Sequence, residues 1–201
     1  LLPGGTYVAL ALVDHTATLF DVRNGGVERI YNHDGRVNSV DTHFSKNLLL
    51  SGSDDFSARL WNLNTGNQIF RWNMDEEVQL VKLSPDGSLA FTMAKYAQAA
   101  IWNTATGEKT GEIPLGSSAI RRGKILTSIA FSEDSEWLLT GTADRVVQLW
   151  RTNDMEEIKR WKTPRRNKAS PTSAAVLALA FESDSRFYAI TSDGFLHRLS
   201  K

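Results

Sequence analysis

Apolar and polar residues alternate along most of the chain in short runs that are separated by turn-forming residues. In one clear example, the runs are Val37 to Phe44, Leu48 to Ser53, Ser57 to Leu63 and Gln68 to Trp72. The residues between the runs are rich in Asp, Asn, Ser and Gly. A period of two, broken about every 8–12 residues by such turns, predicts antiparallel β-strands. No segment has the helical period that would predict an amphipathic helix.

This four-strand pattern recurs, and each copy carries a large apolar residue at the same place in its third strand. These residues are Phe20, Trp61, Trp102, Trp150 and, in a weaker last copy, Leu199. They are separated by 41, 41, 48 and 49 residues. Repeats of roughly 40–45 residues with four strands each are typical of the blades of a β-propeller. The sequence therefore predicts an all-β propeller.

The segment SGSDDFSARLWN at Ser51 to Asn62 resembles the signature of the WD40-repeat family, and the resemblance covers essentially the whole chain. The aspartate of the family's Trp-Asp pair is replaced by Asn62, Asn103 and Arg151, and only Asp21 keeps it, beside Phe20. The resemblance implies a WD40-type β-propeller. The motifs are specific for this fold, but the fold by itself says little about function.

We expect about four and a half blades in this chain. The expected units are residues 1–32 (strands b to d of a first blade), 33–73, 74–115 and 116–162 (one blade each) and 163–201 (strands a to c of the last blade). Rings of the resembled family close when an N-terminal segment supplies the outer strand of the final blade. The expectation is therefore the C-terminal part of a seven-bladed ring, whose missing N-terminal blades lie upstream; alternatively, a partner chain completes the ring.

Composition narrows the class of protein. Hydrophobic residues make up 41% of the 201 residues, which is typical of a chain with a sizeable core. There is no cysteine, so disulfides and thiolate metal sites are excluded. The sequence has no run of about 18 apolar residues, so no transmembrane segment is predicted. The 23 basic side chains are balanced by 23 acidic ones, which argues against a nucleic-acid partner. Localisation stays open between the cytoplasm, as a default, and the bacterial envelope or periplasm, which a weaker likeness to uncharacterised bacterial WD40 proteins suggests.

His33, Ser51 and Asp55 have the residue types of a catalytic Ser-His-Asp triad. The family resemblance implies a different role, because WD40 blades often bury a His, an Asp, a Ser or Thr and the strand-c Trp in one hydrogen-bonded network. The matching residues are His33, Ser51, Asp55 and Trp61 in one unit, and Thr140, Asp144 and Trp150, without a histidine, in another. Buried polar groups need such partners. We interpret both sets as structural and predict no catalytic residue.

The remaining candidate chemistry is sparse. His15, His43 and His197 stand at no metal-ligand spacing, so no metal or cofactor is predicted. Trp72 and Trp161 each follow an arginine near the end of a fourth strand. Their rings are expected to cover the seams between blades; the alternative is an exposed aromatic contact for a partner.

Two long connections carry the clearest functional signal. They are Pro114 to Lys124 and Lys162 to Ala175, which the resemblance places on one face, the top, of adjacent blades. Their basic side chains are Arg121, Arg122, Lys124, Lys162, Arg165, Arg166 and Lys168. No acidic residue occurs from Ile113 to Ser132 or from Arg160 to Phe181. The acidic residues expected on the opposite face are Asp86, Glu133, Asp134, Asp154, Glu182 and Asp184.

These features favour a non-enzymatic scaffold that binds a protein or peptide, expected to be acidic, on the top face. One alternative is a propeller enzyme, which predicts perturbed carboxylates around a pocket at the mouth of the central channel. The other is a binder of nucleic acid or anionic lipid through the basic loops, which predicts a steep salt dependence.

Overall fold

The computed structural model describes residues 6–95, 98–114, 126–164 and 174–201. The chain forms two compact units, unit 1 (Leu1–Lys109) and unit 2 (Thr110–Lys201). In the described residues, all regular structure is β-strand except for one short 3-10 turn, η1 (Phe44–Lys46). The all-β class predicted from the alternating runs is therefore confirmed. No helix in the described part of the chain is long and apolar enough to cross a membrane.

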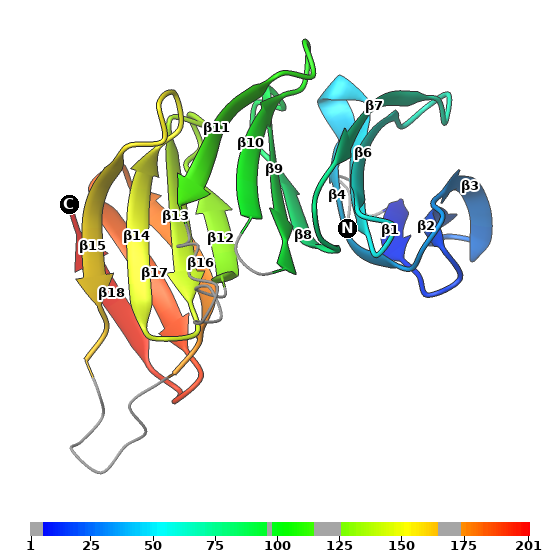
Figure 1. Ribbon diagram of the computed structural model, residues 1–201. Helices are drawn as coiled ribbons and strands as arrows, with labels where there is room; N and C mark the ends of the chain where they lie inside the picture. Colours follow the sequence, from blue (N-terminus) through cyan, green and yellow to red (C-terminus); the bar gives the residue numbers. More distant parts are fainter. Residues whose placement is uncertain (1–5, 96–97, 115–125, 165–173) are drawn as a thin grey trace. The chain divides into compact units, whose positions relative to one another are not determined.

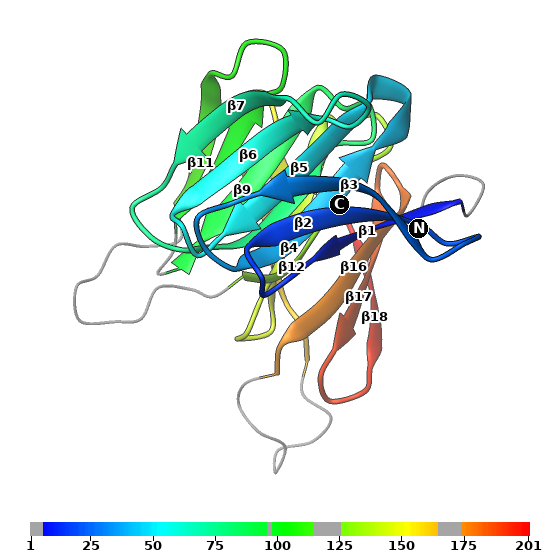
Figure 2. The ribbon, with the colours of Figure 1, turned by 90° about the vertical axis from the view of Figure 1, so that its right-hand side faces the viewer.

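Unit 1 contains antiparallel sheets with the strand orders β1-β2-β3, β4-β5-β6-β7 and β8-β9-β10-β11 (Figures 1 and 2). The strands are β1 (Tyr7–Ala11), β2 (Thr16–Asp21), β3 (Gly26–Asn32), β4 (Val37–His43), β5 (Leu48–Ser53), β6 (Ser57–Asn62), β7 (Gln68–Asn73), β8 (Val78–Leu83), β9 (Leu89–Ala94), β10 (Gln98–Asn103) and β11 (Lys109–Pro114), which begins at the last residue of the unit. The four strands predicted between Val37 and Trp72 are observed, with ends shifted by at most one residue.

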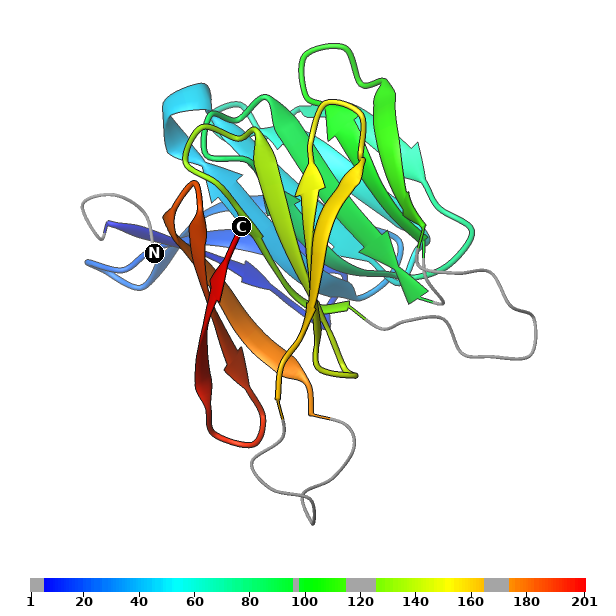
Figure 3. The same cartoon turned by 90° about the vertical axis from the view of Figure 1, so that its left-hand side faces the viewer.

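Unit 2 contains the sheets β12-β13-β14-β15 and β16-β17-β18, which lie side by side (Figure 3). The strands are β12 (Leu126–Phe131), β13 (Trp137–Thr142), β14 (Val146–Arg151), β15 (Glu157–Lys162), β16 (Val176–Ser183), β17 (Arg186–Thr191) and β18 (Leu196–Ser200). Each of the five sheets thus lies within one copy of the repeat.

Neighbouring sheets within a unit pack through their apolar faces. Between the first and second sheets, the buried residues are Ala17, Leu19, Tyr31, Val37, Leu49, Trp61 and Leu63. Between the fourth and fifth sheets they are Leu139, Val147, Leu149, Val176, Phe187 and Ala189. Every residue of β5 is buried, because the second sheet has a neighbour on each face.

Two glycines let adjacent sheets approach closely. A Cβ atom on Gly52 would lie 2.5 Å from Val78 Cγ1, and one on Gly141 would lie 2.6 Å from Val176 Cγ1. Both valines open the first strand of the following sheet. Any larger residue at either glycine would push the two sheets apart, so these positions fix the spacing between blades.

Polar side chains on β4 cover the edge of β8. Ser39 Oγ accepts a hydrogen bond from Val81 N at 3.1 Å, and Asp41 Oδ2 accepts one from Leu83 N at 2.8 Å. Asn38 Nδ2 donates to Val78 O at 2.9 Å. Because β8 is the edge strand of its sheet, these bonds give partners to backbone groups that the sheet itself leaves unpaired.

Candidate functional site

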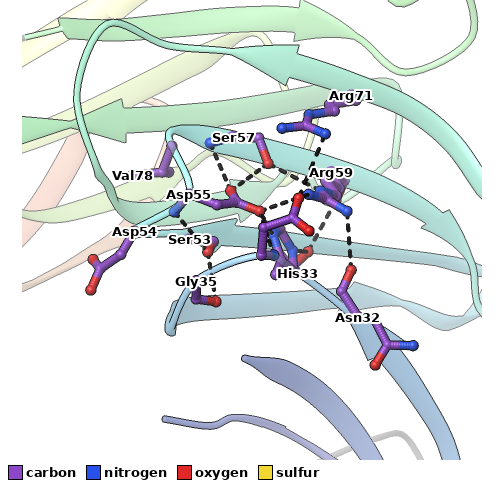
Figure 4. Close-up of polar contacts among 12 residues, drawn as sticks. Asn32, His33, Gly35, Ser53, Asp54, Asp55, Ser57, Arg59, Arg71 and Val78 are labelled. Carbon is purple, nitrogen blue, oxygen red and sulfur yellow. Dashed lines mark hydrogen bonds and ion pairs between the residues drawn. The ribbon is translucent and has the colours of Figure 1, made fainter. Parts of the chain in front are cut away.

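The residues of triad type do meet, at one end of the second sheet, and Figure 4 shows two of them, His33 and Asp55. His33 lies in the connection between β3 and β4, Asp55 lies in the β5–β6 turn, and Ser51 lies on β5. His33 Nδ1 is 3.0 Å from Asp55 Oδ2, and His33 Nε2 is 2.7 Å from Ser51 Oγ. Trp61 Nε1, on β6, donates to Ser51 Oγ at 2.8 Å. The four residues therefore form one hydrogen-bonded chain.

Every polar side-chain atom of these four hydrogen-bonded residues has a partner. With its proton on Nδ1, the His33 ring donates to Asp55 and accepts from the Ser51 hydroxyl, whose oxygen accepts from Trp61. The Ser51 side chain has 0% exposure, and His33 is buried as well. A hydroxyl that is sealed from substrate and already engaged in this way is poorly suited to nucleophilic attack. The geometry therefore fits a structural role better than a catalytic one.

Sequence reasoning missed two members of the network, Arg59 and Asp34. Arg59, on β6, donates through Nη2 to Asp55 Oδ2 at 2.7 Å and to Asp34 Oδ2 at 2.8 Å. Its Nη1 donates to Asn32 O at 3.1 Å and its Nε to Ser57 Oγ at 3.1 Å. The arginine side chain is only 10% exposed. The available signal was a charged residue in the middle of the buried strand SARLW, four positions after Asp55.

Asp55 is held in its ionised form. Burial alone would raise the pKa of this carboxyl, but hydrogen bonds from His33, Ser57 and the Asp34 backbone outweigh burial and hold the pKa well below its usual range. Ser57 donates to Asp55 Oδ1 through both its backbone N, at 3.0 Å, and its hydroxyl, at 2.6 Å. Both carboxylate oxygens are therefore occupied, which favours the charged form.

The contact between Trp61 and Ser51 is repeated in other sheets. Trp102 Nε1 donates to Thr92 Oγ1 at 2.8 Å, and Trp150 Nε1 donates to Thr140 Oγ1 at 2.9 Å. In each pair the hydroxyl residue stands ten positions before the tryptophan. The first and last repeats have Phe20 and Leu199 instead, and ten positions before them stand Leu10 and Ala189. A hydroxyl is present at this place only in the repeats whose third strand carries a tryptophan, because the indole N–H needs an acceptor.

The sequence-based expectation that Asp144 joins Thr140 and Trp150 in a buried network of the fourth sheet needs correction. Thr140 and Trp150 are bonded as expected, but the Asp144 side chain is exposed. The arginine that holds Asp55 is replaced by Gln148, and no histidine was found in the sequence at the place of His33. Without these partners a buried carboxylate would be costly, so the aspartate faces solvent.

Arg145, the residue after Asp144, is buried and joins two sheets of unit 2. Its Nη2 donates to Asp193 Oδ2 at 2.7 Å, and its Nη1 donates to Pro164 O at 3.0 Å. Arg145 has a left-handed backbone, with φ of 67°, as do His15 and Phe56 at the matching place in their turns. Position-matched turn residues thus serve different purposes in different repeats.

The two rim tryptophans are packed. Trp72 is buried, donates through Nε1 to Gly107 O at 2.8 Å and stacks on Trp102 at a ring distance of 5.1 Å. Trp161 is half-buried and meets Phe187 edge to face at 5.5 Å. Both therefore cover seams between sheets, as expected, rather than standing free for a partner.

Of the seven basic residues predicted to bind a partner, the structure describes Lys162, which is exposed at the end of β15. The other six lie outside the described residues: Arg121, Arg122, Lys124, Arg165, Arg166 and Lys168. In the described part of the chain, no group of three or more His, Asp or Glu side chains is arranged to hold a metal ion.

Comparison with known proteins agrees with this architecture. The family model for the WD domain, G-beta repeat, matches residues 26–62 and 119–151. Periodic tryptophan protein 2 of Saccharomyces cerevisiae is 28% identical over 152 residues, which are 74% of this chain and 16% of that protein. Eukaryotic translation initiation factor 3 subunit I of Lodderomyces elongisporus is 24% identical over 190 residues, which are 89% of this chain and 54% of that protein. The guanine nucleotide-binding protein subunit beta of Arabidopsis thaliana is 30% identical over 147 residues, which are 68% of this chain and 38% of that protein.

Among solved structures, the β-propeller domain of Cps50 (Swd1) from Myceliophteria thermophila matches 97% of this chain and 62% of its own, with a TM-score of 0.77 and 18% sequence identity. At this level of identity the match shows the fold alone. The chain spans at most 54% of the length of the three relatives named above.

Proposed function

We propose that this chain, which carries repeats of the WD40 family and has the corresponding β-propeller fold, is a non-enzymatic scaffold that binds a protein or peptide on its top face. The observation that carries the proposal is the sealed network of Ser51, His33 and Asp55, because the most triad-like residues are committed to internal bonds. Two of the relatives named above are, by their names, subunits of larger assemblies. Their names support an interaction role for this chain.

The loops of unit 1 that would form this face are fixed to one another by backbone hydrogen bonds. His33 N donates to His15 O at 2.8 Å, Asp54 N donates to Arg36 O at 2.8 Å, and Met74 N donates to Phe56 O at 2.8 Å. Loops held in series on a rigid scaffold bind with little ordering cost. This rigidity supports the use of the face for recognition.

For the partner, we propose an acidic segment that is attracted by the basic residues between Pro114 and Ala175. Reversing Arg121, Arg122, Arg165 and Arg166 to Glu is expected to abolish capture of the natural partner by the protein. Thermal stability should change little, because charges in long polar connections are usually solvated and are well screened at physiological salt. Pull-down followed by mass spectrometry, with thermal unfolding in parallel, measures both effects.

The matched control neutralises acidic residues expected on the opposite face, through Glu133→Gln, Asp134→Asn and Asp184→Asn, and should leave the captured proteins unchanged. If the four-arginine reversal also leaves them unchanged, the top-face proposal is wrong. If the reversal removes only nucleic acid of any sequence, the alternative of a nucleic-acid binder replaces the scaffold.

We also propose that further blades of the same protein pack on the first and fifth sheets. Leu10, Val27 and Ile30 are exposed on the first sheet, and Leu177, Ile190 and Leu196 on the fifth. Such apolar faces favour association. The isolated chain is therefore expected to self-associate, and the pair Ile190→Lys and Leu196→Lys to reduce its weight-average mass in sedimentation velocity. A monomeric wild-type chain with the same sedimentation as the variant would contradict this.

A further inference from the structure

Two exposed apolar side chains stand on the loops of unit 1. Val13, in the β1–β2 turn, is 76% exposed, and Phe56, at the tip of the β5–β6 turn, is 47% exposed. Phe56 has a left-handed backbone with φ of 61°, which is rare for a bulky residue. Glycine or asparagine would form this turn more easily, so the turn itself does not require phenylalanine. Its ring faces solvent at a place where folding gains little from it.

The two side chains stand on loops that are joined to one another by hydrogen bonds. We define the unit 1 loop face as residues 13–15, 34–36, 54–56 and 73–77. Val37 N donates to Leu12 O at 3.1 Å, Ser53 Oγ donates to Gly35 O at 2.9 Å, and Met74 N donates to Phe56 O at 2.8 Å. These bonds link each loop to the next, so Val13 and Phe56 are held on a common rigid frame. Figure 4 shows part of this face, where Asp55 lies beside Arg59 and the Asp54 side chain points away from them.

The charges around these apolar side chains are predominantly negative. The exposed or half-buried carboxylates of the face are Asp14, Asp34, Asp54, Asp75, Glu76 and Glu77. Among the ion pairs of the described residues, Arg59 and Arg71 approach Asp34, Arg36 pairs with Asp54, and Lys95 pairs with Glu77, so these four basic groups face six carboxylates. Asp34 keeps 75% of its side chain exposed although Arg59 holds it in place. The face therefore presents an oriented, solvent-facing excess of negative charge.

We propose that the unit 1 loop face binds a basic peptide segment, in which Lys or Arg side chains lie over the carboxylates and apolar side chains contact Phe56 and Val13. The proposal rests on the proposed scaffold function and adds a second site to it, since the loops at residues 114–124 and 162–175 would attract an acidic segment instead. Charge complementarity selects the basic occupant and speeds its association. The aliphatic stems of Lys and Arg also pack well on an aromatic ring, and the cationic groups interact favourably with its face.

The test is a selection of random 12-residue peptides, displayed on phage, against the 201-residue chain at physiological salt. Enriched peptides should carry Lys or Arg together with at least one aliphatic or aromatic residue. Synthesised versions should bind the variant Phe56→Asn with Val13→Ser at least tenfold more weakly. Phe56→Asn is chosen because asparagine adopts the left-handed conformation readily, so the turn and the unfolding midpoint should be preserved. Raising the salt concentration should weaken binding further.

A parallel selection uses the variant with Arg121, Arg122, Arg165 and Arg166 reversed to Glu, which separates the two proposals. Acidic peptides lost only in that variant support the proposed function, whereas basic peptides lost only in the Phe56 and Val13 variant support the present inference. If selection yields no basic peptide, or if the basic peptides bind the Phe56 and Val13 variant unchanged, the inference is wrong whatever happens to the acidic ones. Val22→Ser, at an exposed apolar residue in the β2–β3 turn, is the control and should leave basic-peptide binding unchanged.

Discussion

Replacing Trp61 with alanine is expected to lower the free energy of unfolding by about 3–5 kcal/mol, the usual cost of emptying a buried aromatic site. Trp61 is 6% exposed and lies in the seam between the first and second sheets, where its ring is 5.6 Å from Tyr31 and 5.9 Å from His33. The substitution would also remove a hydrogen bond from Ser51. Urea unfolding followed by circular dichroism measures the change.

Trp61→Phe is the matched control, because it keeps most of the ring volume and removes the N–H, as in the first repeat, where Phe20 stands at this place. The loss should be smaller, about 1–3 kcal/mol, since the cavity is smaller and one net hydrogen bond contributes about 1 kcal/mol. A near-neutral result for Trp61→Ala would mean that the seam does not depend on this ring.

Replacing Asp55 with alanine is expected to cost about 3–5 kcal/mol, because it removes the buried carboxylate that both His33 and Arg59 contact and leaves Arg59 with only the exposed carboxylate of Asp34. The Asp55 side chain is 4% exposed, and its partner Arg59 is 10% exposed. Asp144→Ala at the matching turn of the fourth sheet is the control. Because Asp144 is exposed, its loss should be within about 0.5 kcal/mol. Equal losses for the two variants would contradict the difference between the two turns.

The contribution of Asp55 to stability should also depend on pH. Because the pKa of Asp55 is lowered in the folded protein, its contribution to stability is present above the unfolded value of about 3.9 and is lost as the pH falls toward the folded value. The stability of the wild-type chain should therefore decline below about pH 4 more steeply than that of Asp55→Ala.

In a double-mutant cycle at neutral pH, His33 and Asp55 should show a coupling of about 0.5–3 kcal/mol. Additive losses would count against a shared network.

The repeat made the architecture readable from the sequence. Phe20, Trp61, Trp102 and Trp150 recur at nearly constant intervals, and strands of alternating polarity surround each of them. Local β-patterning and long-range packing point to the same structure in this chain, so strand ends were predicted to within one residue in the second repeat. The resemblance to the WD40 family, and not the recurrence itself, implied that His33, Ser51 and Asp55 lie near Trp61.

The rest of the site depended on contacts that spacing does not encode. Arg59 enters the network because its side chain crosses from β6 to the β3–β4 connection, which joins Asp34 to Asp55. The exposure of Asp144 follows from the absence of such an arginine, so a matched turn sequence predicted a matched environment wrongly. The left-handed Phe56 gave no signal either, because nothing in its neighbours marks the backbone conformation.

The pairing of each strand-c tryptophan with a hydroxyl ten residues earlier restricts the order in which a repeat can diverge during evolution. If the hydroxyl is lost first, as in Thr140→Ala, the indole N–H of Trp150 is left buried without its acceptor, a step that costs about 1–3 kcal/mol. If the tryptophan changes first, the remaining hydroxyl keeps an alternative partner within reach, since Ser51 Oγ lies 3.4 Å from the backbone carbonyl oxygen of Arg59. A repeat can therefore lose its tryptophan before its hydroxyl at a smaller cost in stability than in the opposite order. The first repeat, with Phe20 and Leu10, has neither the tryptophan nor the hydroxyl, the state in which such a route ends.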